Sequence, residues 1–266
     1  MNFTYTILIG LLIGSFLNVC IYRLPKGESV VFPSSYCYSC KSNLKLFDLI
    51  PVASWLMLFG KCRYCNTQIS IRYPLVELLT GILFSVCFLK LDITLELTKA
   101  LILTSFLIVI TFIDYDHQLI LDKVVIWLAG AGVVINLILN NINQILSSFD
   151  IQTSFIVSYT SIPDMLLGAL LGGGLLLLIA VASRGGMGGG DIKFAAALGL
   201  WLGWKFTLMT LLISFILGGV FGVIILALKL KGRKDYIPFG PFIAAGAFIS
   251  YLYGIDILKL YIRWIM

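Results

Sequence analysis

The chain has 266 residues, of which 60% are hydrophobic and only 12% are charged, and its mean hydropathy is +1.02. Soluble globular proteins contain roughly 45–50% apolar and about 25% charged residues, so a soluble enzyme, a disordered tail and a disulfide-rich secreted module are excluded. The net charge of +6 comes from 19 basic and 13 acidic residues, and in so apolar a chain it indicates basic loops at a membrane rather than a nucleic-acid partner. The composition predicts a multi-pass membrane protein.

The apolar runs have the length and composition of transmembrane helices. A helix needs about 20 apolar residues to cross the hydrocarbon core of a bilayer, and these Leu- and Ile-rich runs lack the alternation that is typical of strands. We interpret the first run as a membrane span rather than a signal peptide, because no Lys or Arg precedes it. The sequence thus predicts an all-α polytopic membrane protein with about eight transmembrane helices, over residues 3–22, 75–90, 99–113, 124–141, 164–182, 194–206, 208–228 and 240–256.

The basic residues predict how these spans are oriented. When the spans alternate in direction, 14 of the 19 Lys and Arg residues fall on one side of the membrane. The positive-inside rule assigns that side to the cytoplasm and the N-terminus to the outside.

Residues 23–74 form a polar segment between the first two spans and contain two Cys-x-x-Cys pairs. The pairs are Cys37-Tyr38-Ser39-Cys40 and Cys62-Arg63-Tyr64-Cys65, with 21 residues between them. Each pair can present two thiolates to one tetrahedral ion, and disulfides are less compatible with a reducing cytoplasm. We therefore predict a structural Zn²⁺ bound by Cys37, Cys40, Cys62 and Cys65, which so short a segment needs in order to fold.

Two acidic residues lie at ends of membrane spans. Asp114 ends the third apolar run, and Asp191 follows the run Gly188-Gly189-Gly190. The topology drawn from Lys and Arg places both on the same membrane face. Two carboxyls that share a site cannot both ionise easily, so one can act as a base while the other holds a proton. That is aspartyl-protease chemistry, and the glycines before Asp191 would let a peptide backbone approach closely.

Simpler roles fit the same residues. Asp114 can cap a span in the headgroup region, and Asp191 can be the N-cap of a helix, so spacing alone leaves both interpretations open. The glycine run does not predict a phosphate loop, because such a loop needs Gly-Lys-Ser or Gly-Lys-Thr after a strand. We interpret His117, the only histidine, as a solvated residue at the membrane surface.

Short motifs along nearly the whole chain resemble those of the type IV prepilin peptidases, the bacterial membrane aspartyl proteases that trim prepilins and pseudopilins. Each motif is weak alone, but their order and spacing together are specific. This sequence departs from the family at Leu121-Asp122, where Pro-Asp or Pro-Asn is usual. The matching motifs are Gly14-Ser15-Phe16-Leu17-Asn18, Arg23-Leu24-Pro25, the two cysteine pairs with Gly60-Lys61, Ile69-Ser70-Ile71-Arg72-Tyr73-Pro74-Leu75-Val76-Glu77, Ile113-Asp114, Gly188-Gly189-Gly190-Asp191-Ile192-Lys193 and Pro238-Phe239-Gly240-Pro241.

The resemblance implies roles for individual residues. Asp114 and Asp191 match the two catalytic aspartates of the family, and the four cysteines match its zinc-binding quartet. Many members also methylate the new N-terminus with S-adenosylmethionine, and our candidates for that methyl-donor site are Arg72 and Glu77. The supporting positions around the aspartates are Gly188, Gly190, Lys193 and Asp116.

The resemblance also implies the function and its location. We expect cleavage of the basic leader of prepilins or pseudopilins after a glycine, on the cytoplasmic face of the bacterial inner membrane, followed by N-methylation. The expected partners are these substrates and the lipid bilayer, without nucleic acid. The expected domains are a first transmembrane helix over 1–22, a zinc-binding domain over 23–74 and a transmembrane protease domain over 75–266.

Two other classes of protein fit part of the pattern. A non-catalytic membrane scaffold of a pilus or secretion assembly could use the zinc knuckles to bind a partner. A transporter could use Asp114 and Asp191 as a proton relay, but the basic-residue topology places both acids at the membrane surface. A zinc metalloprotease fits less well than the transporter, since the cysteine quartet has no open position and the sequence has no His-Glu-x-x-His motif.

Overall fold

A computed structural model describes residues 3–148, 160–229 and 237–265 of the chain. Within these ranges the regular elements are helices, and seven of them are long and apolar enough to cross a membrane. The described residues contain no β-strand, so the prediction of an all-α polytopic membrane protein is confirmed. The seven long helices are α1 (Phe3–Arg23), α3 (Arg72–Leu91), α4 (Leu95–His117), α5 (Asp122–Ser148), α6 (Ile162–Ala182), α7 (Gly189–Ala227) and α8 (Gly240–Ile265).

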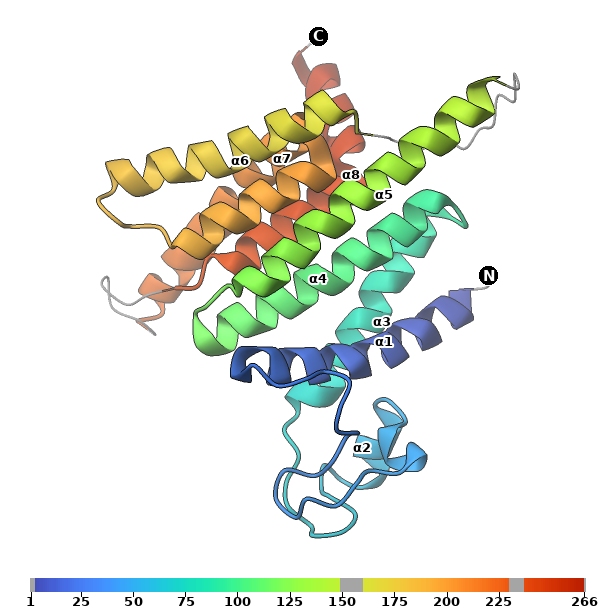
Figure 1. Ribbon diagram of the computed structural model, residues 1–266. Coiled ribbons are helices and arrows are strands. Elements are labelled where there is room, and N and C mark those ends of the chain that lie inside the picture. Colours follow the sequence, from blue (N-terminus) through green and yellow to red (C-terminus); the bar gives the residue numbers. More distant parts are fainter. Residues whose placement is uncertain (1–2, 149–159, 230–236, 266) are drawn as a thin grey trace. The chain divides into compact units, whose positions relative to one another are not determined.

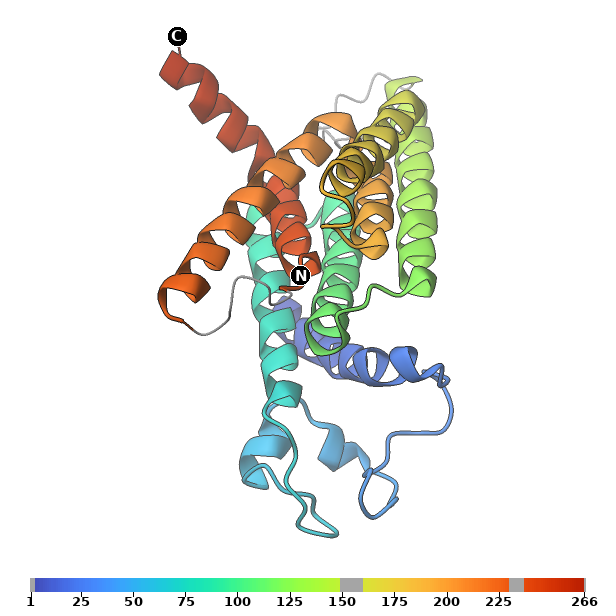
Figure 2. The same ribbon diagram turned by 90° about the vertical axis from the view of Figure 1, so that its left-hand side faces the viewer.

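The difference between seven helices and the expected eight lies in α7. This 39-residue element contains both the sixth and the seventh predicted spans, and it is broken at Gly203, where φ is 71° and ψ is 173°. Residues with a side chain rarely adopt that backbone conformation, whereas glycine does so readily. At Gly203 the chain changes direction, so α7 consists of two consecutive helices (Figure 2). The predicted boundary, residue 207, is four residues beyond the real one.

The chain forms two compact units, and α4 contributes to both. The N-terminal unit contains Met1–Ile93 and Ala100–Val109, and the C-terminal unit contains Thr94–Lys99 and Ile110–Met266.

In the N-terminal unit, α1 and α3 pack with their backbones in close contact. A Cβ atom on Gly10 would lie 2.7 Å from the Cα of Gly81, and one on Gly14 would lie 2.7 Å from the Cα of Glu77. Small residues permit this close approach of membrane helices. The contact positions the residues that connect α1 to α3, which include the short helices η1 (Leu24–Lys26), η2 (Leu46–Leu49) and α2 (Ala53–Met57) (Figure 1).

The two cysteine pairs of this connecting segment lie on two loops with the same backbone pattern. In the first loop the amide of Cys37 donates to Ser42, and in the second the amide of Cys62 donates to Thr67, each at 2.9 Å. An isolated β-bridge joins residues at the base of each loop, Tyr36 to Asn43 and Lys61 to Gln68. The repeated pattern produces the paired cysteine loops that the Cys-x-x-Cys spacing predicted.

In the C-terminal unit, the first half of α7 runs beside α6, and small residues bring the two backbones together (Figure 1). A Cβ on Gly168 would lie 2.5 Å from the carbonyl oxygen of Gly199, and one on Gly172 would lie equally close to that of Ala195. The order of these pairs shows that α6 and this half of α7 are antiparallel.

The second half of α7 packs against α8 in the same manner. A Cβ on Gly246 would lie 2.6 Å from the carbonyl oxygen of Thr210, and one on Gly254 would lie 2.6 Å from Cε1 of Phe206. The order of these contacts shows that the second half of α7 and α8 are antiparallel as well. The break at Gly203 therefore allows one element to serve as the partner of both α6 and α8.

The close contact at Gly168 generates a prediction. Gly168→Val would force α6 away from α7, and because overpacking of this kind costs about 1–3 kcal/mol, we expect a lower midpoint of thermal unfolding for the detergent-solubilised protein. Gly174→Val is the matched control in the same helix, because a Cβ at Gly174 meets nothing within 4 Å. Equal midpoints for the two variants would contradict the packing described here.

Candidate functional site

Asp114 lies in the last turn of α4 and is buried, with 3% of its surface exposed. The helix ends three residues later, where Gln118 adopts a left-handed conformation and its amide donates to the Asp114 carbonyl at 2.8 Å. The Asp114 carboxylate accepts a hydrogen bond of 3.0 Å from the backbone amide of Gly240, the first residue of α8. Two helix ends distant in sequence thus position this side chain.

Asp191 lies in the first turn of α7, directly after the glycine run, and is 4% exposed. Gly188 is the N-cap of the helix, with extended backbone angles. Gly190 lies against Ile120, whose Cβ would be 2.9 Å from a Cβ at the glycine position. The glycines therefore let α7 begin close to the turn that follows α4.

The two buried carboxyls are close enough for their charges to interact. Both belong to the C-terminal unit and both lie at helix ends. Like charges in a weakly polar environment repel strongly. Asp114 and Asp191 are thus both buried in one unit, and their role as a catalytic pair stays a prediction.

Two of the supporting residues predicted around the aspartates, Lys193 and Asp116, lie at exposed positions. Lys193 forms an exposed ion pair with Asp122, with its Nζ at 2.7 Å and 2.8 Å from the two carboxylate oxygens. This pair joins the beginnings of α5 and α7, and its acid, Asp122, directly follows Leu121, the residue at which the family motif is altered. Asp116 and His117 are exposed at the end of α4.

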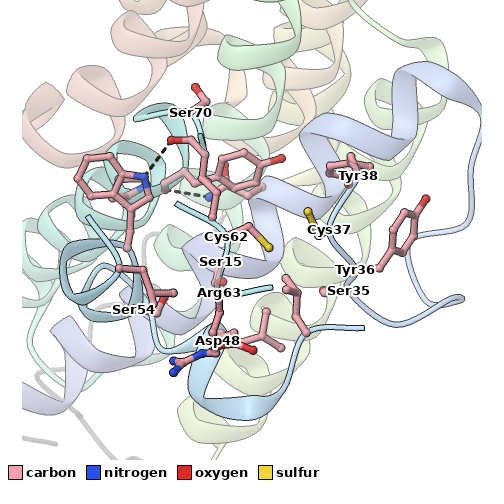
Figure 3. Close-up of a pocket in the computed structure, with 18 of the residues that line it drawn as sticks. Ser15, Ser35, Tyr36, Cys37, Tyr38, Asp48, Ser54, Cys62, Arg63 and Ser70 are labelled. Atoms are coloured by element: carbon pink, nitrogen blue, oxygen red, sulfur yellow. Dashed lines mark hydrogen bonds and ion pairs between the residues drawn. The ribbon is translucent and has the colours of Figure 1, made fainter. Parts of the chain in front are cut away.

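The sulfur atoms of Cys37, Cys40, Cys62 and Cys65 all lie within 4.8 Å of one another. Those of Cys37 and Cys65 are 3.8 Å apart, which is about the separation of two thiolates on one tetrahedral Zn²⁺ with Zn–S bonds of about 2.3 Å. Figure 3 shows the sulfurs of Cys37 and Cys62 near each other. The cluster is compatible with zinc, and four thiolate ligands would leave no position for a reactive water.

Hydrogen bonds from neighbouring side chains favour the thiolate form in part of this cluster. The hydroxyl of Thr67 is 3.3 Å from the sulfur of Cys65, and this contact is the main cause that lowers the pKa of the Cys65 thiol to about 6. In the first loop the thiol of Cys40 donates to the hydroxyl of Ser42 at 3.3 Å, and contacts with Ser42 are the main cause that lowers the pKa of Cys40. The equivalent residues of the two loops therefore prepare equivalent ligands.

A cavity of about 250 Å³ lies in the N-terminal unit, bordered by α1, α3 and the cysteine-containing segment (Figure 3). Glu77 lines this cavity, and its carboxylate accepts a 2.7 Å hydrogen bond from the amide of Val52. Arg72, the other residue proposed for the methyl-donor site, is not among the residues that line the cavity. Asn18 lines it too, and its amide oxygen is buried without a hydrogen-bond partner among the described residues.

One more charged group forms the wall of this cavity. Asp48 is largely buried, which by itself would raise the pKa of its carboxyl, but Arg63 and Tyr64 donate to it at 2.6 Å and 3.0 Å, and its pKa is lowered overall. Asp48 and Arg63 thus form an ion pair that connects η2 to the second cysteine loop (Figure 3).

Two features of these sites were not predicted from the sequence. The first is the amide of Gly240 beside Asp114, although Gly240 belongs to a quoted motif. The second is the cavity with Asn18, which also belongs to a motif, the run Gly14–Asn18. In both cases the motif was the available signal, and only the fold shows what its residues contact.

Family models match most of the chain. Residues 8–91 match the bacterial peptidase A24 N-terminal domain, and residues 101–223 match the type IV leader peptidase family. No solved structure matches the chain significantly.

Proteins of similar sequence match over nearly their full length. A prepilin leader peptidase/N-methyltransferase of Aeromonas salmonicida (strain A449) is 33% identical over 99% of this chain and 95% of its own length. The proteins of the same name from Pseudomonas aeruginosa and Bacillus subtilis (strain 168) are each 34% identical, over 97% and 96% of this chain and 93% and 95% of their own lengths. These matches confirm the family resemblance stated from the motifs.

The cysteine cluster generates a prediction about metal content. We expect the purified wild-type protein to contain about one zinc ion per chain, as four-cysteine sites do, and Cys40→Ser to lose most of it because three thiolates bind the ion far more weakly. The measurement is elemental analysis by mass spectrometry. Cys87→Ser, which changes a buried cysteine within α3, is the control and should retain its zinc; metal in Cys40→Ser at the wild-type level would refute the assignment.

Proposed function

This chain belongs to the type IV leader peptidase family, and we propose that it is a membrane aspartyl endopeptidase that removes the basic leader of type IV prepilins or pseudopilins. The cut falls directly after a glycine, between the leader and the hydrophobic helix of the substrate. The proposed catalytic groups are Asp114 and Asp191. The observation that carries this assignment is that both carboxyls are buried at helix ends within the same compact unit.

The proposed mechanism needs one proton shared by the two carboxyls. The ionised carboxyl takes a proton from a water molecule while the water oxygen attacks the carbonyl carbon of the glycine. The protonated carboxyl donates a hydrogen bond to the carbonyl oxygen as negative charge develops there. When the C–N bond breaks, the pair supplies a proton to the leaving nitrogen, and the peptide is divided into a carboxylic acid and an amine.

The distribution of basic residues supports a cytoplasmic location for this reaction. We infer that the N-terminus lies outside and that the ends of α4 and α7 carrying the aspartates face the cytoplasm of the bacterial inner membrane. The hydrophobic helix of the substrate lies in the bilayer, so its junction with the leader reaches the membrane surface at the depth of these helix ends. A proton relay through the membrane centre would need the acids farther from the ends of their helices.

We further propose that the new N-terminal amine is methylated with S-adenosylmethionine. The names of the relatives support this second activity. The cysteine cluster then has a structural role, in which zinc fixes the fold of residues 23–74 while residues 75–266 contain the protease.

Replacement of either aspartate tests the proposed mechanism. Asp114→Asn and Asp191→Asn each remove a group that must gain or release a proton, and loss of general acid–base catalysis lowers rates by about 10²–10⁴-fold. We expect cleavage of a co-expressed prepilin, followed by gel mobility, to fall by that amount while the protein remains in the membrane. Asp92→Asn, an exposed substitution after α3, is the control; wild-type processing by both aspartate variants would instead support the non-catalytic scaffold.

The hydrogen bond from Gly240 provides a second test of the same site. In Gly240→Ala the new Cβ would lie 2.6 Å from the carboxylate oxygen of Asp114, so the carboxylate must move. Misplaced catalytic groups lose rate steeply, and we expect a decrease of about 10²-fold in cleavage. Gly222→Ala is the control because its Cβ meets nothing within 4 Å. Equal rates for the two variants would show that Gly240 does not position Asp114.

A further inference from the structure

We propose that the cavity of the N-terminal unit binds the positively charged amino-acid end of S-adenosylmethionine. The proposal rests on the methyltransferase part of the proposed function and assigns its cofactor site. The sequence analysis offered Arg72 and Glu77 for this role. The structure assigns the role instead to the residues around the cavity, among them Glu77, Asn18 and Arg23.

A buried carboxylate gives the cavity a negative group. Glu77 is only 7% exposed, and the hydrogen-bond donors that meet it, the amide of Val52 and the hydroxyl of Ser15, are both neutral. A buried charge is stable only when it is paired or well hydrogen-bonded. With neutral donors alone, this buried carboxyl holds a negative charge stably only when a cationic group, such as a sulfonium or an ammonium, binds beside it.

Asn18 adds a fixed hydrogen-bond acceptor. Its side chain is 2% exposed, and its amide nitrogen donates to the carbonyl of Tyr73 at 3.0 Å and to that of Gly14 at 3.4 Å. These bonds orient the amide, and its oxygen is left buried without a partner among the described residues. Such an orphan acceptor requires an explanation, and the ammonium group of a bound amino acid would satisfy it.

The guanidinium group of Arg23 lines the same cavity and would complement a negative group of the ligand. Arg23 is buried, and the acceptors of its hydrogen bonds are backbone carbonyls of Ser29, Pro33 and Ser34. Its positive charge is therefore available to a carboxylate. Glu77 and Arg23 together match a ligand that carries an ammonium, a carboxylate and a further positive charge, as S-adenosylmethionine does.

Aromatic side chains complete the wall. The indole of Trp55 is held in place by a 3.1 Å hydrogen bond from its Nε1 to the carbonyl of Ile69, and Tyr38 and Tyr73 also line the cavity. Aromatic rings attract cations such as a sulfonium. The volume of about 250 Å³ is slightly below the usual range of about 300–1,000 Å³ for small-molecule sites. We therefore assign this space, which the zinc-ligand candidates Cys37 and Cys62 also line, to the amino-acid end and the sulfonium, and the adenosine to the mouth of the cavity.

The chemistry that the cofactor supplies is a methyl group on a sulfonium leaving group. The amine nitrogen uses its lone pair to form the N–C bond, the C–S bond breaks with its electrons going to sulfur, and one proton leaves the nitrogen for water. The sulfur becomes a neutral thioether. A site that recognises the sulfonium charge therefore binds S-adenosylmethionine more tightly than S-adenosylhomocysteine, and it releases the latter after the methyl group is transferred.

The test measures cofactor affinity rather than activity. Isothermal titration calorimetry of the zinc-loaded, detergent-solubilised full chain would compare S-adenosylmethionine with the neutral-sulfur product S-adenosylhomocysteine. We expect Glu77→Gln to weaken binding of S-adenosylmethionine by about tenfold or more, the usual effect of losing an interaction with a charged group, and to weaken binding of the thioether less. Glu28→Gln removes an exposed acid of the same segment that does not line the cavity and should bind both as the wild type does.

A second measurement covers the case in which Glu77→Gln fails to fold, which zinc content and thermal unfolding would reveal. Ultraviolet cross-linking of radiolabelled S-adenosylmethionine to the wild-type protein, followed by peptide mapping, should label peptides from residues 15–23 or 36–77. Label confined to residues 110–227 would overturn the proposal, as would unchanged affinities in a folded Glu77→Gln variant.

The outcomes separate this inference from the proposed function. A wild-type protein that methylates prepilin but cross-links outside the cavity refutes only the site. A protein that cleaves prepilin but binds no S-adenosylmethionine refutes both the site and the methylation, and leaves the protease assignment standing. Asp114→Asn should abolish cleavage and retain the wild-type affinity for the cofactor.

Discussion

The contact between the backbones of α6 and α7 is the constraint on which the aspartate site depends. Gly168 and Gly199 allow the two helices to approach until only hydrogen atoms fit between them, and this fixes where α7 begins. The start of α7 in turn sets the position of Asp191, because this residue lies in the first turn of the helix. α8, which packs on the other half of α7, brings the amide of Gly240 to Asp114. The proposed catalytic groups are therefore held by the ends of helices, which hold geometry more accurately than loops do.

The chain divides its polar chemistry between its two compact units. The aspartates lie in the C-terminal unit, whereas the cysteine cluster and the cavity lie in the N-terminal unit. The units use different means to hold polar groups in an apolar chain. Helix ends and glycines hold the aspartates, while the cavity depends on a small segment with almost no apolar core, for which the predicted zinc ion would supply the stability that burial cannot.

The features that depend on local sequence could be predicted, and those that depend on distant contacts could not. Apolar runs predicted the helices, and the spacing of Cys37 and Cys40 predicted a knuckle, because both are set by neighbours in the chain. The break in α7 was predicted at residue 207, whereas it lies at Gly203. Hydropathy shows roughly where one span ends and the next begins, but it does not show which residue leaves the helical conformation. The Gly240–Asp114 bond joins residues 126 positions apart, and the Asn18–Tyr73 bond joins residues 55 apart. No periodicity or spacing rule reaches so far, so the cavity became visible only in the fold.

The close grouping of thiols has a consequence for the metal-free state. Sulfur atoms that lie 3.8 Å apart, as those of Cys37 and Cys65 do, are within a small movement of covalent bonding to each other, and the thiolate character of Cys65 makes it an effective nucleophile. A bound metal engages the reactive lone pairs and keeps the sulfurs reduced. If the predicted zinc were removed, the segment would become sensitive to air, and disulfides between its two cysteine loops would lock them in a shape that no longer accepts the metal.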